Sequence, residues 1–358
     1  MSDKSTIALI DMYLEDATTP PFLSGFFRSP PQNFHTTEDI EIDIQRDTEE
    51  VAIVIQDLSL PPNHNENSLY TNKRLKPPIY DEEGAVTSFD MIQRQPGQNP
   101  FANPNYAANA VQQSFAIFRK LESKIRRAIE LQASQVLQTG SLSLINKAGV
   151  VVYTINFSPK ATHFTTPTAW AADGSTGDPL ANIESLGTIV RRDGKREPNK
   201  LIFGLGAYAR FLANTKVAAR LLQTRGQLIE AAPVARGAGA TFQGWVWAGH
   251  YRFEMWTYDG FYMHPQTGAF TPFVADNKVI MLGDGRLDLT YGAIPMIVAP
   301  DQRALPFLPP RISSAGAGLD LTTNAWVTPD GKRVMVSAGT RPLTIPTAID
   351  TFGCITAF

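Results

Sequence analysis

Residues 105–139 contain neither glycine nor proline, and this stretch limits the possible folds more than any other feature of the sequence. Read as one helix, its roughly 35 residues would span about 50 Å, because each residue of an α-helix adds ~1.5 Å. A helix of that length exceeds the diameter of a small domain. We therefore expect an elongated molecule in which the helix lies along another element, such as a sheet.

The ends and the apolar face of this predicted helix are consistent with its length. Asn103 can cap it, Pro104 suits its first position, and Gly140 suits the left-handed residue that ends a helix. Apolar residues recur mostly at spacings of three and four: Val111, Phe115, Phe118, Leu121, Ile125, Ile129 and Val136. Basic residues off this stripe are predicted to form a solvated face: Arg119, Lys120, Lys124, Arg126 and Arg127.

The composition of the 358-residue chain excludes several classes of protein. With 43% hydrophobic and 18% charged residues it can build a sizeable core, which excludes global disorder. A net charge of −2 argues against a protein whose main task is to bind phosphates. The single cysteine, Cys354, excludes an intramolecular disulfide. The sequence has no secretory signal and no apolar run of the ~20 residues that a membrane helix needs, so we expect no membrane partner.

The first 95 residues are predicted to form an extended arm and a long hairpin. Residues 1–48 mix prolines with aromatic residues and end in a strand at 40–44 whose isoleucines alternate with acids. Residues 51–60 predict an outgoing strand, 61–77 a polar tip with few side chains to bury, and 85–95 the returning strand. Exposed aromatic residues in such an arm need a surface to cover them.

The rest of the chain predicts a mixed α+β fold without an internal repeat. Strands are predicted at 141–149, 150–157, 200–204, 242–263 (a pair turning at 248–250), 276–285, 286–298 and, as several strands, 324–358. Asp178 and Pro179 predict the start of a second helix, and 207–222 predicts a third. An Ala/Gly-rich coil is expected between that third helix and the strand pair.

The segment "LIFGLGAYA" matches a dinucleotide-binding fingerprint. Gly204, Gly206 and Ala209 have the required spacing after a predicted strand, and Glu230 lies near the place of a ribose-binding acid. A nucleotide-binding unit should continue as alternating strands and helices. Here a coil and a β-hairpin follow, so a plain strand–helix turn explains the glycines better, and no cofactor is predicted.

Other candidates for chemistry are weaker. The five histidines do not have metal-ligand spacing, and no Cys-x-x-Cys motif is present. Cys354, on a predicted terminal strand, is expected to be a buried small apolar residue. The acids Asp81, Glu82 and Glu83 are expected to be exposed partners for Lys or Arg. An arm, a hairpin and a rod, without a convincing active site, indicate a structural protein that assembles with copies of itself and is not an enzyme.

Four segments together resemble the lambda-type phage major capsid protein E family. They are "FFR" at 26–28 with "TTE" at 36–38, "NPFANPNYAANA" before the long helix, "TFQGWVWAGHYRFEMWTYDGFYM" with "ADNKVIMLG", and the closing block from "WVTPDGKRVMV". The resemblance implies the Hong Kong 97 fold. It assigns 1–48 to an N-terminal arm, 49–95 to an extended loop (E-loop), 96–178 to a P-domain with spine helix 105–139, 179–324 to an A-domain, and 325–358 to a return to the P-domain.

The same resemblance implies a function and partners. The chain is expected to be the head-shell protein of a tailed double-stranded DNA bacteriophage, forming hexamers and pentamers of an icosahedral shell. Expected partners are a portal protein, a scaffolding protein supplied in trans, a possible trimeric cementing protein and weakly held packaged DNA. Expected locations are the virion capsid and, during assembly, the host cytoplasm. The alternatives are an encapsulin-like compartment of the same fold and, more distantly, a nucleotide-dependent enzyme.

Contacts between subunits are expected in the arm, the loop tip and the acid cluster. The residues predicted to make these contacts are Phe22, Phe26, Phe27, Arg28, Lys73, Arg74, Lys76, Asp81, Glu82 and Glu83. The arm aromatics are expected to pack against a neighbouring subunit or under the extended loop. The cations of the tip are expected to pair with acids of a neighbour. No covalent crosslink is predicted, because no partner asparagine can be aligned with Lys73 or Lys76.

Overall fold

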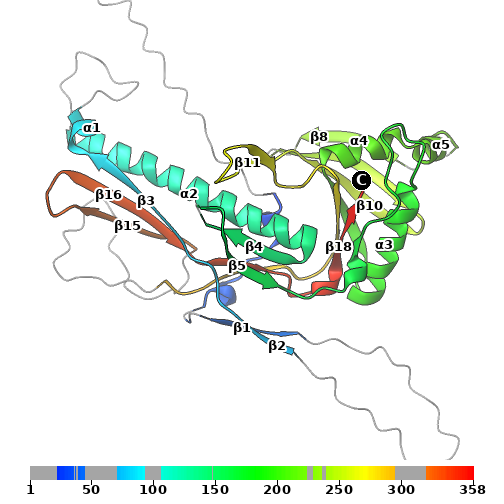
Figure 1. The fold of residues 1–358 in the computed structure, drawn as a ribbon, viewed down its shortest axis with the longest axis horizontal. Coiled ribbons are helices and arrows are strands. Elements are labelled where there is room, and N and C mark those ends of the chain that lie inside the picture. Colours follow the sequence, from blue (N-terminus) through cyan, green and yellow to red (C-terminus); the bar gives the residue numbers. More distant parts are fainter. Residues whose placement is uncertain are drawn as a thin grey trace, which may run out of the picture.

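The computed structural model describes residues 22–35, 37, 39–44, 71–92, 106–146, 148–223, 229–235, 239–294 and 320–358. The predicted strand at 51–60, most of the predicted tip at 61–77, and Asn103 and Pro104 lie outside the described residues. In Figure 1, a long helix runs through an elongated part of the molecule and ends beside a more compact part that holds the largest sheet.

The long helix α2 (Tyr106–Thr139) confirms the prediction from the sequence. Gly140 ends it with φ of +66°, and its N–H donates to the carbonyl of Val136 at 2.8 Å. The predicted apolar face is buried from Leu121 onward. The prediction of a buried position is wrong at Phe115, which is 48% exposed. The N-terminal part of the helix therefore packs less completely than the periodicity indicated.

The largest sheet has seven strands and both of its faces are covered. Their spatial order is β6 (Phe164–Thr165), β18 (Phe352–Thr356), β13 (Lys278–Gly283), β7 (Pro198–Phe203), β10 (Tyr251–Tyr258), β9 (Ala240–Ala248) and β8 (Ile229–Ala235). The pairs β7/β10 and β6/β18 are parallel, and the other neighbours are antiparallel. One face packs on α3 (Pro179–Gly194), α4 (Leu205–Ala213) and α5 (Thr215–Gln223).

Alternate residues of this sheet enter two different cores. On β7, Leu201 and Phe203 belong to the cluster with α3–α5, whereas Ile202 belongs to the cluster that includes the buried face of α2. Because both faces are buried, the strand reads as the continuous apolar run "LIF". The prediction of strands at 200–204 and 242–263 and of a helix starting at Pro179 is confirmed, with the Asp178 side chain accepting the N–H of Ala181 at 3.2 Å.

The elongated part is a three-stranded antiparallel sheet with α2 lying along it (Figure 1). Its strands are β15 (Thr322–Val327), β16 (Arg333–Thr340) and β3 (Tyr80–Thr87), with the short helix α1 (Ser88–Ile92) after β3. Gly84 permits the close approach of α2, since a Cβ at that position would lie 2.5 Å from Cγ2 of Ile117. The predicted returning strand at 85–95 is wrong at 88–92, which are helical, and its predicted partner at 51–60 lies outside the described residues. Among the described strands, β3 pairs with β16.

Two cations of α2 are tied to this sheet. Arg126 Nη2 lies 2.6 Å from Asp320 Oδ2, just before β15, and Lys124 Nζ lies 2.6 Å from Glu82 Oε2 on β3. The predicted solvated basic face is thus wrong for Arg126, which is partly buried against the sheet, whereas Lys124 pairs with Glu82 and stays exposed. Each such partly exposed pair contributes about 1 kcal/mol or less.

Four two-stranded sheets complete the fold. They pair β1 (Ile40–Ile44) with β2 (Thr71–Leu75), β4 (Ser141–Ile145) with β5 (Val151–Asn156), β11 (Phe261–Met263) with β12 (Phe270–Pro272), and β14 (Asp288–Tyr291) with β17 (Pro342–Ile345). Short 3₁₀ helices occur at Ser24–Phe26, Pro31–Asn33, Ala161–His163 and Ile349–Thr351. The predicted hairpin at 141–157 and the predicted strand at 40–44 are confirmed.

Three further expectations are corrected. Residues 71–75 form a strand with buried Leu75, so the end of the predicted polar tip is part of the folded body. The predicted helix 207–222 breaks at Asn214, whose buried side chain accepts the N–H of Lys216 and thereby starts α5. The segment expected to be coil before β9 contains β8, which extends the largest sheet.

Candidate assembly surfaces

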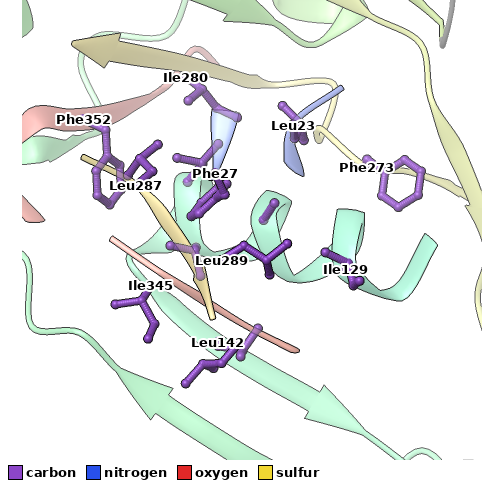
Figure 2. Close-up of a cluster of buried hydrophobic side chains, with 14 of the residues drawn as sticks. Leu23, Phe27, Ile129, Leu142, Phe273, Ile280, Leu287, Leu289, Ile345 and Phe352 are labelled. Atoms are coloured by element: carbon purple, nitrogen blue, oxygen red, sulfur yellow. The ribbon is translucent and has the colours of Figure 1, made fainter. Parts of the chain in front are cut away.

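The described first part of the predicted arm, residues 22–27, packs into the core of its own subunit. Leu23 is fully buried and Phe27 is 4% exposed, and both belong to the cluster that contains the inner face of α2. Figure 2 shows them among side chains such as Ile129 of α2 and Ile280 of β13. The ring of Phe22 lies 5.0 Å from that of Tyr258. The expectation of packing against a neighbour or under the extended loop is therefore wrong for Phe27, which is buried in its own core. Phe22 and Phe26 pack partly buried against the same cluster.

A buried glutamate of α2 holds this segment in place. Glu130, 2% exposed, accepts the N–H of Leu23 at 2.6 Å and those of Phe22 and Ser24 at 3.2 and 2.9 Å. It also accepts the hydroxyls of Ser24 at 2.6 Å and of Tyr258 at 3.0 Å. A carboxylate with several donors is a satisfied buried group. Burial, with the Glu130 charge next, raises the pKa of Tyr258, so its hydroxyl remains a donor.

After this anchor the arm runs beside β14. The N–H of Arg28 donates to Leu287 and its carbonyl accepts from Leu289, each at 2.8 Å, and the ring of Phe34 stacks on Tyr291 at 5.0 Å. The arm therefore extends the β14/β17 pair by backbone hydrogen bonds.

The predicted loop cations mostly have partners within the subunit. Lys73 Nζ donates to the carbonyl of Asn156 at 3.2 Å and to Ser158 Oγ at 2.8 Å. The Arg74 guanidinium lies 3.1 Å from Glu41 on the paired strand β1. The carbonyl of Lys76 accepts the hydroxyl of Tyr153. These contacts join β2 to β1 and β5, which the prediction of a free polar tip did not anticipate.

The predicted acid cluster lies on β3 and not at a hairpin tip. Glu82 faces α2 and pairs with Lys124, whereas Asp81 and Glu83 point to the other, exposed side. Neither Asp81 nor Glu83 makes an ion pair with any residue that the structure describes. Of the three acids, these two are the ones open to another chain.

A surface that the sequence did not indicate is formed by two hairpins. A Cβ on Gly149 in the β4–β5 turn would lie 2.4 Å from the Gln266 side chain in the β11–β12 turn, so the two turns touch. The hairpins expose six large apolar side chains, which we call the hairpin patch: Val150, Val151, Val152, Phe261, Met263 and Phe270. Met263 and Phe270 are a cross-strand pair, 61% and 75% exposed. Such clustered exposed apolar residues mark interaction sites.

The dinucleotide fingerprint has no room for a phosphate. The N–H of Ala207, at the start of α4, already donates to the carbonyl of Asp276 at 2.6 Å. A Cβ on Gly204 would lie 2.2 Å from the carbonyl oxygen of Ala275, so this glycine serves close packing of the 275–277 segment. Glu230 lies on β8 beside Trp245. The reading of these glycines as a plain strand–helix turn is confirmed.

The remaining candidate groups are structural. Burial raises the pKa of the Cys354 thiol to about 12, which disfavours a reactive thiolate and confirms the predicted buried cysteine. His163 is fully buried between the carbonyl of Phe352 and the carboxylate of Asp193.

The part of the chain that the structure describes contains no group of three or more His, Cys, Asp or Glu arranged to hold a metal. Among the described helices, none has the length and hydropathy needed to cross a bilayer.

The long helix on an antiparallel sheet, the compact α/β part and the projecting β1–β2 ribbon are those of a capsid-shell subunit of the Hong Kong 97 type. The sequence profile of phage major capsid protein E matches residues 8–356. The chain belongs to this family, and it is a phage capsid protein whose place is in the virion shell.

Two solved phage structures agree on the fold, and a third structure has a lower score. A protein described as a prophage capsid protein of E. coli CFT073 aligns with a TM-score of 0.64 at 15% identity, over 94% of this chain and 93% of that one. A structure from Mycobacterium phage Bobi aligns with a TM-score of 0.50 at 10% identity, over 98% and 94%. The holo-SrpI encapsulin complex of Synechococcus elongatus PCC 7942 aligns at 0.45 and 12% identity, over 95% and 90%. No curated protein sequence matches the chain.

Proposed function

We propose that this protein tiles the icosahedral head shell of a tailed phage as hexamers and pentamers around packaged double-stranded DNA. Membership of the capsid family supports a structural role without a catalytic step. We further propose assembly in the host cytoplasm with a portal protein and with scaffolding supplied in trans. A trimeric cementing protein is a fitting partner for a shell without predicted crosslinks.

The domain roles are part of the same proposal. Residues 1–48 act as the arm, 49–95 as the extended loop, 96–178 with 325–358 as the P-domain, and 179–324 as the A-domain. Contacts between neighbouring subunits then involve the exposed acids Asp81 and Glu83 and the β1–β2 ribbon. A two-stranded ribbon is only marginally stable by itself, which favours a role in contact with another surface.

The observation that carries the assembly proposal is the hairpin patch. Its six large apolar side chains, on two touching hairpins, are in contact with water in the isolated subunit. Their exposure does not stabilise a monomer, so they indicate a contact with another chain. Burial of a large apolar side chain against a neighbour contributes roughly 1.5–3 kcal/mol. In a shell the same contact recurs in every copy, so even a modest contribution favours closure.

The test is an assembly assay with matched variants. The double variant Met263→Ser/Phe270→Ser removes the most exposed part of the hairpin patch, and Leu212→Ser removes an exposed apolar residue of α4 outside it. We expect both to fold with wild-type thermal midpoints, while electron microscopy finds closed shells for wild type and Leu212→Ser only. Normal shells from the double variant would contradict the role of the patch. Nucleic acid inside purified shells distinguishes a phage head from an encapsulin-like compartment, which would hold protein.

A further inference from the structure

A cavity lined by three arginines lies where the arm meets the rest of the subunit. Its volume is about 330 Å³, at the small end of ligand pockets. Arg28 comes from the arm, Arg196 from the segment after α3, and Arg286 from the loop between β13 and β14. Three segments far apart in the sequence thus place guanidinium groups around one concave surface.

Two of these arginines are placed by firm contacts. The backbone of Arg28 is held by its two 2.8 Å hydrogen bonds to Leu287 and Leu289. Arg286 Nε lies 2.7 Å from Oδ2 of Asp288, whose side chain is 6% exposed and also accepts the Thr347 hydroxyl at 2.6 Å. A guanidinium has five N–H donors, so this single Nε contact leaves the other four N–H groups of Arg286 for a ligand.

The wall of the cavity is tightly packed backbone. A Cβ on Gly194 would lie 2.4 Å from the carbonyl oxygen of Asp350, and one on Gly285 would lie 1.9 Å from Oγ1 of Thr351. Lys195, with φ of +53°, turns the chain immediately after α3 and directs it to Arg196. These close approaches fix the segments that carry Arg196 and Arg286, so the concave shape is built into the fold.

The charges around the cavity favour an anion. No described residue makes a hydrogen bond or ion pair with the guanidinium of Arg28 or of Arg196. Asp284 is the one carboxylate among the lining residues, and Asp288 lies behind Arg286. Three guanidinium groups and these two carboxylates give the cavity a net charge of +1. The whole chain has a net charge of −2, so the cavity is more positive than the protein as a whole.

We propose that this cavity is an anion site that binds a phosphate group. Planar guanidinium groups match the oxygens of phosphate with paired, charge-assisted hydrogen bonds. The cavity is too small for a duplex but can receive one backbone phosphate of DNA or a free phosphate ion. The site does not depend on shell formation, and it is therefore tested on unassembled full-length subunits.

The experiment is calorimetric titration of the subunit with inorganic phosphate, with charge-matched variants. Arg28→Gln and Arg196→Gln each remove a guanidinium that has no described partner, so both are expected to fold normally. Arg191→Gln is the control, because Arg191 lies on α3, pairs with Glu197 at 3.9 Å and does not line the cavity. We expect each cavity variant to weaken phosphate binding about fivefold, equivalent to ~1 kcal/mol, and the control to leave it unchanged.

Two competition arms identify the natural ligand. If a short DNA duplex displaces phosphate from wild type, and itself binds the double variant Arg28→Gln/Arg196→Gln more weakly than wild type, packaged DNA is the source. If it does not displace phosphate, the site serves a free phosphate ion. Wild-type affinity in both Arg28→Gln and Arg196→Gln would overturn the proposal. A second result would also overturn it: a peptide of residues 79–85 that displaces phosphate and binds at a lower concentration than phosphate does. The occupant would then be an acidic strand of a second copy of the chain. If Arg28→Gln fails to fold, Arg196→Gln decides the outcome.

Discussion

The carboxylate of Glu130, on the buried face of α2, accepts the backbone N–H of Leu23 at 2.6 Å, so α2 holds residues 22–24 from inside the core. An acid in this position is stabilising only while its donors remain aligned with it. Replacing Glu130 by alanine leaves three backbone N–H groups and two hydroxyls without their acceptor.

We expect Glu130→Ala to lower the free energy of unfolding by about 3 kcal/mol, because unsatisfied buried donors cost more than a hydrogen bond contributes. Urea denaturation of the unassembled subunit measures this. Glu122→Ala is the control on the same helix, since its side chain is 37% exposed, and it should change the free energy by less than about 0.5 kcal/mol. Equal losses in the two variants would contradict the anchoring role.

Asp193 predicts a pH dependence of stability. Burial alone would raise the pKa of its carboxyl group, but hydrogen bonds from Arg192, Lys160 and His163 outweigh burial and hold the pKa to about 2. Because this folded-state pKa is below the unfolded value of 3.8, the contribution is present above pH 4 and lost as the pH falls towards 2.

We expect Asp193→Asn to cost about 1–2 kcal/mol at pH 5–7, a figure reduced because two of the cations are solvent-exposed. The difference from wild type should shrink between pH 4 and pH 2. Denaturant unfolding at four pH values checks this. A difference that stays constant down to pH 2 would show that the carboxylate is not stabilised in the folded protein.

Substitution by aspartate at a buried and at an exposed position of α2 compares the two faces of the helix. Ile125→Asp places a charge at a position that is 3% exposed, and we expect it to abolish folding. Phe115→Asp makes the same change at a position that is 48% exposed, and Arg119→Ala removes an exposed cation, so both should fold. Circular dichroism distinguishes them. A folded Ile125→Asp protein would mean that this face of the helix is not buried.

The arm is expected to stabilise the subunit itself. Phe27→Ala should lower the free energy of unfolding by about 3–4 kcal/mol, as is usual for a buried phenylalanine. Removal of residues 1–30 should therefore destabilise the unassembled subunit. An unchanged thermal midpoint after that truncation would contradict packing of the arm within its own subunit.

The extended loop can be tested without disturbing the core. Replacing residues 61–70 by a short Gly–Ser linker keeps β2 and buried Leu75, so we expect a wild-type thermal midpoint and a failure to form closed shells. Leu75→Asp is the contrasting variant, and it should destabilise the subunit itself. Electron microscopy and a thermal melt give the two measurements. Normal shells from the linker variant would show that the loop is dispensable.

Local patterns in the sequence predicted the elements whose causes are local. The apolar spacing and the absence of glycine and proline gave α2, and Asp178–Pro179 gave α3. Local patterns could not predict which strands pair when the two strands are far apart in the sequence. The partners of β3 and β2 had to be found among strands elsewhere in the chain, and alternation alone does not specify them.

The sites were harder to predict than the elements. Glu130 looks like an ordinary polar residue of an amphipathic helix, because its donors are about 106–128 residues away in the chain. The cavity joins Arg28, Arg196 and Arg286, which share no motif and come together only through the fold. The fingerprint around Gly204 could be excluded from the sequence, because the chain that follows it does not continue as alternating strands and helices.

The pairing of the arm with β14 has a consequence for the ribosome-bound chain. Residues 22–35 are synthesised before β14 and its partner β17, which are completed only at residue 345. At about 5–20 residues per second, this interval lasts roughly 15–60 s. During that time the core that Leu23 and Phe27 enter is incomplete, because α2 has been made but β14 and β17 have not. Both side chains are then accessible to chaperones and to neighbouring nascent chains. Completion of this part of the subunit thus waits until residue 345 has been made, which separates its folding in time from the building of shells.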